Sequence, residues 1–193
     1  MLATLGIGAL VLALVLVAAI ATRPAAFRVQ RGTAIAAPAE VVFAHLADLR
    51  RWAAWNPFQK VDPTMQVTHG GAAAGVGSSY HYAGKKIGEG RMTIAEIQPS
   101  RHVGVKAEFI RPCTATNRID FTVEPAATGV TLTWAISGRN TFTGKAFSLF
   151  VNMDRMIGGD FEKGLADLKR IAEAEAAAST SRSSARALRG AAA

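Results

Sequence analysis

The sequence predicts an α+β domain in which a curved antiparallel sheet is covered on one face by a long C-terminal helix. Apolar and polar residues alternate through most of 65–137, as in strands with one buried face. Over 147–171 the apolar residues recur every three or four positions, which predicts an amphipathic helix. Residues 2–21 are apolar except for Thr4 and carry no charge. About 20 such residues can cross the roughly 30 Å hydrocarbon core of a bilayer.

The apolar run predicts an uncleaved transmembrane anchor over 1–22, followed by a hinge at 23–26. Nothing basic precedes the run, and it is longer than the apolar part of a usual signal peptide. Ala19-Ile20-Ala21 nevertheless has the small-x-small form of a cleavage site, so cleavage and export stay open as the alternative. By the positive-inside rule, Arg23, Arg28 and Arg31 place the domain in the cytoplasm.

The net charge of +8 lies mainly at the two ends of the chain. Three arginines follow the apolar run, and three more lie near the C-terminus. The span 32–175 holds 16 basic and 14 acidic residues, so it is nearly neutral. Basic residues beside an anchor suit anionic lipid head groups. A nucleic-acid site would need basic residues clustered with stacking aromatics, and the sequence shows no such cluster, so we expect no nucleic-acid partner.

Cysteine and histidine offer little for metal or catalytic chemistry. Cys113 is the only cysteine, so no intrachain disulfide can form. One cysteine and four scattered histidines do not make a structural zinc site. No histidine has a recognisable carboxylate partner in the sequence, and no activating base is visible for Cys113. We therefore expect no metal, no cofactor and no catalytic residue.

The elements follow in a definite order. A first strand is predicted over 27–36, and Pro38 and Glu40 suit the start of a helix to about residue 48. A short helix or turn follows at 52–58, then about six strands from 65 to 137. The helix over 147–171 comes next, and Gly158-Gly159 interrupts its apolar stripe and allows a bend. The folded domain is thus predicted over 27–176, with a disordered Ala/Ser/Arg tail over 177–193.

Four segments carry a resemblance to a known family: residues 36–43 (AAPAEVVF), 51–57 (RWAAWNP), 88–101 (GEGRMTIAEIQPSR) and 159–169 (GDFEKGLADLK). In this order and spacing, the chain resembles the SRPBCC superfamily. This helix-grip fold is shared by START domains, birch-pollen-allergen-like proteins and the bacterial polyketide cyclase/dehydrase and lipid-transport group.

The resemblance implies a sheet of about seven strands, two short helices and a C-terminal helix over a hydrophobic cavity. Members bind lipids, sterols, polyketides or other apolar molecules, and some are enzymes. Since the superfamily shares no catalytic signature, the resemblance assigns no catalytic residue to this chain.

The candidate cavity residues are mainly aromatic and methionine side chains on inward faces. For each, ordinary core packing is the alternative to ligand contact. The hydroxyls of Tyr80 and Tyr82 need partners if they face inward. Asn117 is a polar residue on an otherwise apolar strand face, and burial of its amide requires a partner. The candidate set is Trp55, Tyr80, Tyr82, Met92, Phe109, Asn117, Phe121, Trp134, Phe147, Phe150 and Met153.

The functional expectation is a membrane-anchored domain that binds a hydrophobic small molecule or lipid in an internal cavity, with transport as its extension. Its expected partners are that ligand and the membrane. One alternative is a polyketide cyclase/dehydrase-like enzyme that polarises a carbonyl with tyrosine and asparagine side chains. Another is an accessory module without a small ligand, whose side chains fill the cavity.

Overall fold

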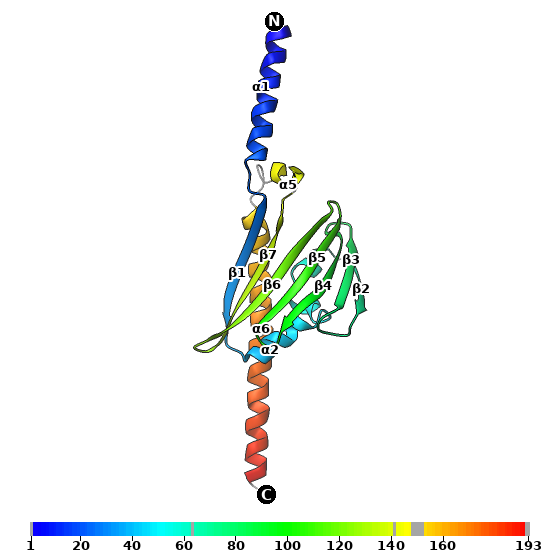
Figure 1. The fold of residues 1–193 in the computed structure, drawn as a ribbon. Coiled ribbons are helices and arrows are strands. Elements are labelled where there is room, and N and C mark those ends of the chain that lie inside the picture. Colours follow the sequence, from blue (N-terminus) through cyan, green and yellow to red (C-terminus); the bar gives the residue numbers. More distant parts are fainter. Residues whose placement is uncertain (1, 63, 141, 148–152, 192–193) are drawn as a thin grey trace.

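The computed structural model describes residues 2–62, 64–140, 142–147 and 153–191 (Figure 1). Within these ranges, the side chains of 2–5, 9, 11–13, 142–143, 147, 153 and 183–191 are outside the description. The elements in chain order are α1 (Leu2–Ala21), β1 (Ala26–Ile35), α2 (Ala39–Ala47), α3 (Trp52–Trp55), α4 (Phe58–Val61), β2 (Gln66–Gly71), β3 (Ser78–Gly84), β4 (Gly88–Gln98), β5 (His102–Arg111), β6 (Ala115–Ala126), β7 (Gly129–Arg139), α5 (Phe142–Phe147) and α6 (Met153–Ala191).

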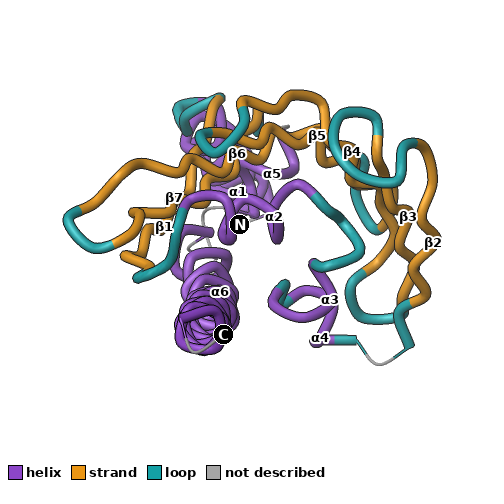
Figure 2. The backbone as a smooth tube through the Cα atoms, turned by 90° about the horizontal axis from the view of Figure 1, so that it is seen from below, coloured by secondary structure: helices purple, strands orange, loops and turns teal. Residues whose placement is uncertain are grey.

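The seven strands form one antiparallel sheet in the order β1-β7-β6-β5-β4-β3-β2. Seen end-on, the sheet curves into an arc, with α6 below the β1 end and α3 and α4 nearer the β2 end (Figure 2). Apolar side chains of the central strands face the inside of this arc, and charged ones face outward. This confirms the predicted α+β class, with a seven-stranded curved sheet and a long C-terminal helix.

Helix α6 lies along β1 and also contacts Trp134 of β7. The Phe161 ring stacks on the Trp134 indole, with centroids 4.1 Å apart and planes 10° apart. One turn further along, Gly164 has no side chain, and a Cβ there would lie 2.7 Å from the indole and 2.8 Å from Pro57. The helix can therefore reach the sheet at this point only because residue 164 is glycine. Beyond it, Leu165 and Leu168 are buried.

A second attachment of α6 comes from Arg31 on β1. Its guanidinium bonds Asp154 (Nη2–Oδ2 3.0 Å) and Glu162 (Nε–Oε1 2.7 Å). It lies directly over Gly158, where a Cβ would collide with it. Arg31, which the sequence analysis grouped with the juxtamembrane charges, is thus paired with two carboxylates of α6. The same contact explains why the Gly158-Gly159 pair lies inside a continuous helix.

The concave face of the sheet is filled near its centre by an aromatic cluster. Trp55 of α3 contacts Trp52 at 5.3 Å and Trp134 at 5.5 Å between ring centroids. Phe121 of β6 is 5.2 Å from Trp134, its cross-strand neighbour, and 5.5 Å from Trp52. All four side chains are buried. The rings meet in tilted and edge-on arrangements, which add to the free energy of area burial, so the cluster fixes α3 under the sheet.

The C-terminal region differs from the sequence prediction beyond residue 176. Of the helix predicted over 147–171, the structure describes Phe147, which ends α5, and the part from Met153 onward, which belongs to α6. In place of a disordered tail, α6 continues to Ala191. Alanine and arginine are strong helix formers, so this segment can continue a helix that packing has already started, even without an apolar stripe. The lack of an apolar stripe after residue 176 indicates that this segment packs against no other element. It does not exclude a helix.

The predicted membrane anchor coincides with α1. Searched over the part of the chain that the structure describes, no helix is both long and apolar enough to span a membrane.

Asp62 joins the loop before β2 to the turn between β3 and β4. Its buried carboxylate accepts hydrogen bonds from the backbone N–H of Lys86 (2.6 Å) and of Ile87 (3.3 Å), and from the Thr64 hydroxyl (2.6 Å). These bonds hold the pKa of Asp62 well below its usual range, the Thr64 side chain having the largest effect. The carboxylate therefore fixes the position of the β3–β4 turn.

The first prediction concerns the approach of α6 at Gly164. Gly164→Ala places a methyl group against Trp134 and Pro57, and overpacking of this kind costs about 1–3 kcal/mol of unfolding free energy. Gly159→Ala is the matched control, because nothing lies within 4 Å of its Cβ position and alanine favours helix by up to about 1 kcal/mol. Chemical denaturation should show the first variant destabilised and the second neutral or stabilised. Equal effects would contradict the close approach.

The second prediction concerns acid stability. Because the folded pKa of Asp62 is depressed, its ionised carboxylate stabilises the fold above the unfolded-state pKa of about 3.9. This contribution is lost as the pH falls from there toward the lower folded-state pKa. Asp62→Asn should reduce stability at neutral pH, and the gap from the wild type should narrow as the pH falls below about 4. Denaturation at several pH values measures this, and a gap that is constant with pH would refute it.

Candidate functional site

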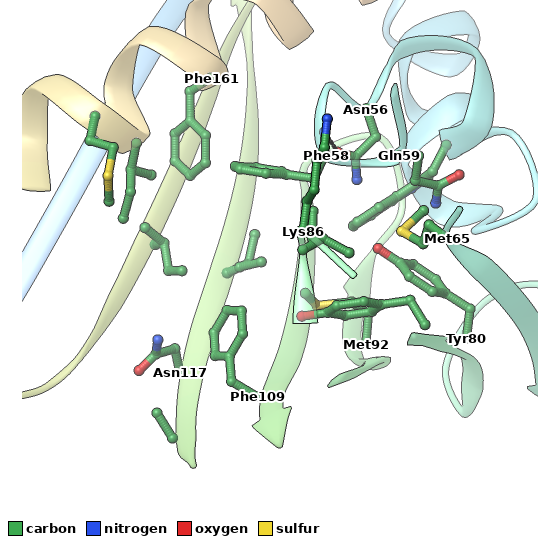
Figure 3. Close-up of a pocket in the computed structure, with 18 of the residues that line it drawn as sticks. Asn56, Phe58, Gln59, Met65, Tyr80, Lys86, Met92, Phe109, Asn117 and Phe161 are labelled. Carbon is green, nitrogen blue, oxygen red and sulfur yellow. Dashed lines mark hydrogen bonds between the residues drawn. The ribbon is translucent and has the colours of Figure 1, made fainter. Parts of the chain in front are cut away.

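A cavity of about 560 Å³ lies between α6, the short helices α3 and α4, and the concave face of the sheet. This volume is within the ~300–1,000 Å³ typical of small-molecule sites. Most of its wall is apolar. Figure 3 shows many of the residues that form it. The described lining residues are Phe27, Trp52, Asn56, Phe58, Gln59, Met65, Tyr80, Tyr82, Lys86, Ile87, Met92, Phe109, Arg111, Pro112, Cys113, Ala115, Asn117, Ile119, Trp134, Ile136, Met156, Ile157 and Phe161.

Tyr82 forms part of the cavity wall by covering a glycine on the next strand. Tyr82 and Gly90 are cross-strand partners, and a Cβ on Gly90 would lie 2.5 Å from the tyrosine hydroxyl oxygen. The register of β4 and β5 shifts between Glu89 and Gly90, as at a β-bulge. The bulge and the missing side chain let the tyrosine lie along the sheet, and the space above it stays open.

The two tyrosines present neutral hydroxyls. Burial raises the pKa of Tyr82 to about 12 and raises that of Tyr80 further. The Gln59 amide beside Tyr80 has a smaller, opposite effect on the Tyr80 pKa. At physiological pH both groups can donate a hydrogen bond to an oxygen of a bound molecule, and neither can act as an anion.

Polar side chains lie at opposite sides of the cavity, with Asn117 on one side and Tyr80 on the other (Figure 3). The Asn117 amide packs against Gly138 of β7, where any side chain would collide with it. No hydrogen bond of the described residues involves this amide. Trp134 Nε1 is buried and also lacks a hydrogen bond within the described part of the chain. Among the lining residues, Asn117 therefore offers an amide without a hydrogen-bond partner in the described ranges.

The rim of the cavity is exposed and includes two cationic residues. Lys86 lies in the β3–β4 turn that Asp62 fixes, and Arg111 ends β5. Arg111 Nη2 pairs with Glu89 Oε2 at 2.5 Å, and Glu89 also bonds His81. These bonds lower the pKa of Glu89, with the His81 contact first among the causes. Met156, 49% exposed, completes the rim from α6.

The structure brings together six of the eleven candidate residues: Tyr80, Tyr82, Met92, Phe109, Asn117 and Trp134 line the cavity. Trp55 and Phe121 do not reach it and pack behind Trp52 and Trp134. Phe150 lies outside the described residues, as do the side chains of Phe147 and Met153. Sequence reasoning missed the rim residues Lys86 and Arg111. These residues could not be found from the alternation of apolar and polar positions, because both are charged residues beside turns.

Three histidines have carboxylate partners that the sequence spacing did not reveal. His45 Nε2 lies 3.1 Å from Glu175, His81 Nε2 lies 3.0 Å from Glu89, and His102 Nε2 lies 2.9 Å from Asp120. The last two are diagonal cross-strand pairs, which register creates and sequence spacing does not reveal. All three pairs lie away from the described cavity wall.

Metal binding finds no support in the described ranges, where no three histidine, cysteine or carboxylate side chains gather closely enough to hold an ion.

Comparison with known proteins gives a family and a fold. A family described as polyketide cyclase / dehydrase and lipid transport matches residues 26–173. Among curated proteins, none matches the chain. A solved protein from Chromobacterium violaceum is 16% identical, with a TM-score of 0.55, and the match covers 78% of this chain and 99% of that one.

Two further structures share the fold at low identity. The Aha1 dimer from Colwellia psychrerythraea is 14% identical with a TM-score of 0.56, and 76% of this chain and 96% of that one are covered. The di-domain ARO/CYC StfQ from the steffimycin biosynthetic pathway is 11% identical with a TM-score of 0.59, and the match covers 79% of this chain and 52% of that one.

The family match spans about three quarters of the chain. It contains all seven strands in full, together with α6 as far as residue 173. With the curved sheet, the covering helix and the cavity between them, this chain belongs to the polyketide cyclase / dehydrase and lipid transport family of the SRPBCC superfamily.

Proposed function

We propose that this chain binds a hydrophobic small molecule or lipid in the cavity under α6, and that α1 holds it at a membrane. The observation that carries the binding proposal is the cavity itself, with its volume of about 560 Å³ and its mainly apolar wall. The family description, which includes lipid transport, is consistent with this reading.

The size of the cavity argues that something fills it. If a void of this volume were dry and empty, extrapolation at ~24 cal/mol per Å³ would give a cost of about 13 kcal/mol. That is comparable with the whole stability of a typical domain, about 5–15 kcal/mol. Water could enter, but an apolar wall gives it few hydrogen-bond partners. An apolar ligand would displace that water and gain about 0.8 kcal/mol for each buried CH₂.

The membrane part of the proposal rests on the apolar sequence of α1. Among the described residues, no helix is long and apolar enough to cross a membrane. Large apolar side chains of α1 are exposed, with Leu10 and Leu14 both at 61%. The linker after α1 is fixed to the domain by Asn140, whose backbone N–H bonds Ala25 O at 2.8 Å. Phe27 and Ile136 line the cavity. Phe27 is the second residue of β1, and α1 leaves the domain at the start of this strand (Figure 1).

A cytoplasmic domain remains our proposal, and cleavage after Ala21 remains its alternative. Arg23 and Arg28 support the cytoplasmic side, while Arg31 no longer contributes because α6 engages it.

An enzyme of the cyclase/dehydrase kind is the second candidate. Tyr80, Tyr82 and Asn117 line the cavity, where they could polarise a carbonyl. An enzyme of this kind would also be favoured by a paired acid and base that face the cavity. The described lining residues include no carboxylate and no imidazole. We therefore place binding first.

The binding proposal is tested by closing the cavity. Ala115 lines it, and the next residue, Thr116, is exposed on the other face of β6. Ala115→Trp should abolish lipid that copurifies with the full-length protein, because the indole would occupy the site. Thr116→Trp should retain it. Mass spectrometry of solvent extracts measures the bound lipid, and thermal melting confirms that both variants fold.

If the wild type carries no apolar molecule and takes up none from vesicles, the binding proposal fails. Retention of the same ligand by Ala115→Trp would mean that it binds elsewhere.

The proposal that α1 anchors the chain in a membrane is tested by placing charged residues in α1. We expect the full-length chain to stay in the membrane pellet after alkaline carbonate washing. Leu10→Arg/Leu14→Arg should release it, since each arginine at a helix centre costs about 2.5–3.5 kcal/mol on insertion. Leu10→Ala/Leu14→Ala is the control and should remain in the pellet. Release of the wild type, or a mature N-terminus after Ala21, would refute the anchor.

A further inference from the structure

The charge around the cavity has one sign. Among the described lining residues, the side chains that are charged at neutral pH are Lys86 and Arg111, and both are cationic. The other lining residues are apolar or neutral. An apolar cavity with two cations and no described carboxylate in its wall favours a ligand that combines an apolar body with an anionic group.

Lys86 is available for such a group. Four lysines of the domain have a carboxylate partner: Lys60 lies 2.6 Å from Asp167, Lys106 2.6 Å from Glu108, Lys163 3.1 Å from Asp160 and Lys169 2.7 Å from Glu173. Lys85 has no such partner among the described residues, but unlike Lys86 it does not line the cavity. Within the described part of the chain, no carboxylate lies within ion-pair distance of the Lys86 ammonium. Arg111 is already paired with Glu89, so it would play the lesser part.

The position of Lys86 is set in advance. Its backbone N–H donates to the buried Asp62 carboxylate at 2.6 Å, and the next residue, Ile87, lines the cavity. The β3–β4 turn is therefore held at the rim before any ligand arrives. Ordering a residue in advance removes part of the entropic cost of binding.

We propose that the cavity selects amphiphiles with one apolar chain and an anionic head, a carboxylate or a phosphate, and that Lys86 holds this head at the rim. The inference rests on the proposed binding function and names the class of its ligand.

Tryptophan fluorescence provides a direct test, because the three tryptophans of the chain, Trp52, Trp55 and Trp134, are buried in or behind the cavity wall. Bromine quenches tryptophan only at short range, so brominated chains report entry into the cavity and not mere partition into a bilayer. The full-length protein would be titrated in phosphatidylcholine nanodiscs with dibromostearate, dibromostearyl phosphate and dibromostearyl alcohol, at a pH that keeps the acids ionised.

We expect either or both acids to bind at least about fivefold more tightly than the alcohol, an advantage that weakens as salt is added. Lys86→Gln should reduce acid binding by about fivefold and leave alcohol binding unchanged. Lys85→Gln is the matched control, because Lys85 is exposed, adjacent and outside the cavity wall, and it should change acid binding by less than about twofold. The two acids distinguish a carboxylate from a phosphate head.

Equal quenching by the alcohol and both acids, or equal effects of Lys86→Gln and Lys85→Gln, would overturn the anionic-head inference and leave the binding function standing. If no brominated chain quenches, both proposals fail.

Discussion

The stacking of Phe161 on Trp134 is the contact on which the site depends. It fixes α6 against β7 at one point, and Gly164 lets the helix backbone come close beside it. A helix is nearly straight and the sheet is strongly curved, so contact at one place creates a gap elsewhere. The cavity is that gap, and its wall begins at Phe161 and Trp134 themselves.

Other contacts keep the gap open at a fixed size. Arg31 holds the first turns of α6 to β1 through Asp154 and Glu162. On the opposite side, Asp62 holds the β3–β4 turn, which carries Lys86. The aromatic cluster behind the wall keeps α3 in place. These three sets of contacts are far apart in the sequence. The cavity is therefore formed by tertiary packing, and no single segment of the chain forms it alone.

This explains what could be predicted from the sequence. Alternation in β6 and β7 and the apolar stripe of α6 gave the sheet and its cover, because burial acts on each element separately. The inward positions of Tyr80, Tyr82 and Asn117 followed from the same alternation. The behaviour of Arg31 did not, because the sequence does not show that Gly158 would make room for its guanidinium. Two of the histidine–carboxylate pairs depend on strand register, and the third joins α2 to α6. The position of Lys86 depends on a turn held by a distant carboxylate. Trp55 and Phe121 were expected to line the cavity and instead pack in the core behind it. Both are buried, and only depth within the fold separates the core from the cavity wall.

The central claim is that an apolar chain occupies the space between α6 and the sheet. A crystal structure of the full-length protein with dibromostearate tests it most directly, because bromine gives an anomalous signal that locates the chain. If an apolar chain occupies this space, bromine peaks will lie inside the cavity, between Phe161 and Tyr82. Bromine found only on the outer surface, or a cavity closed by its own side chains, would contradict it.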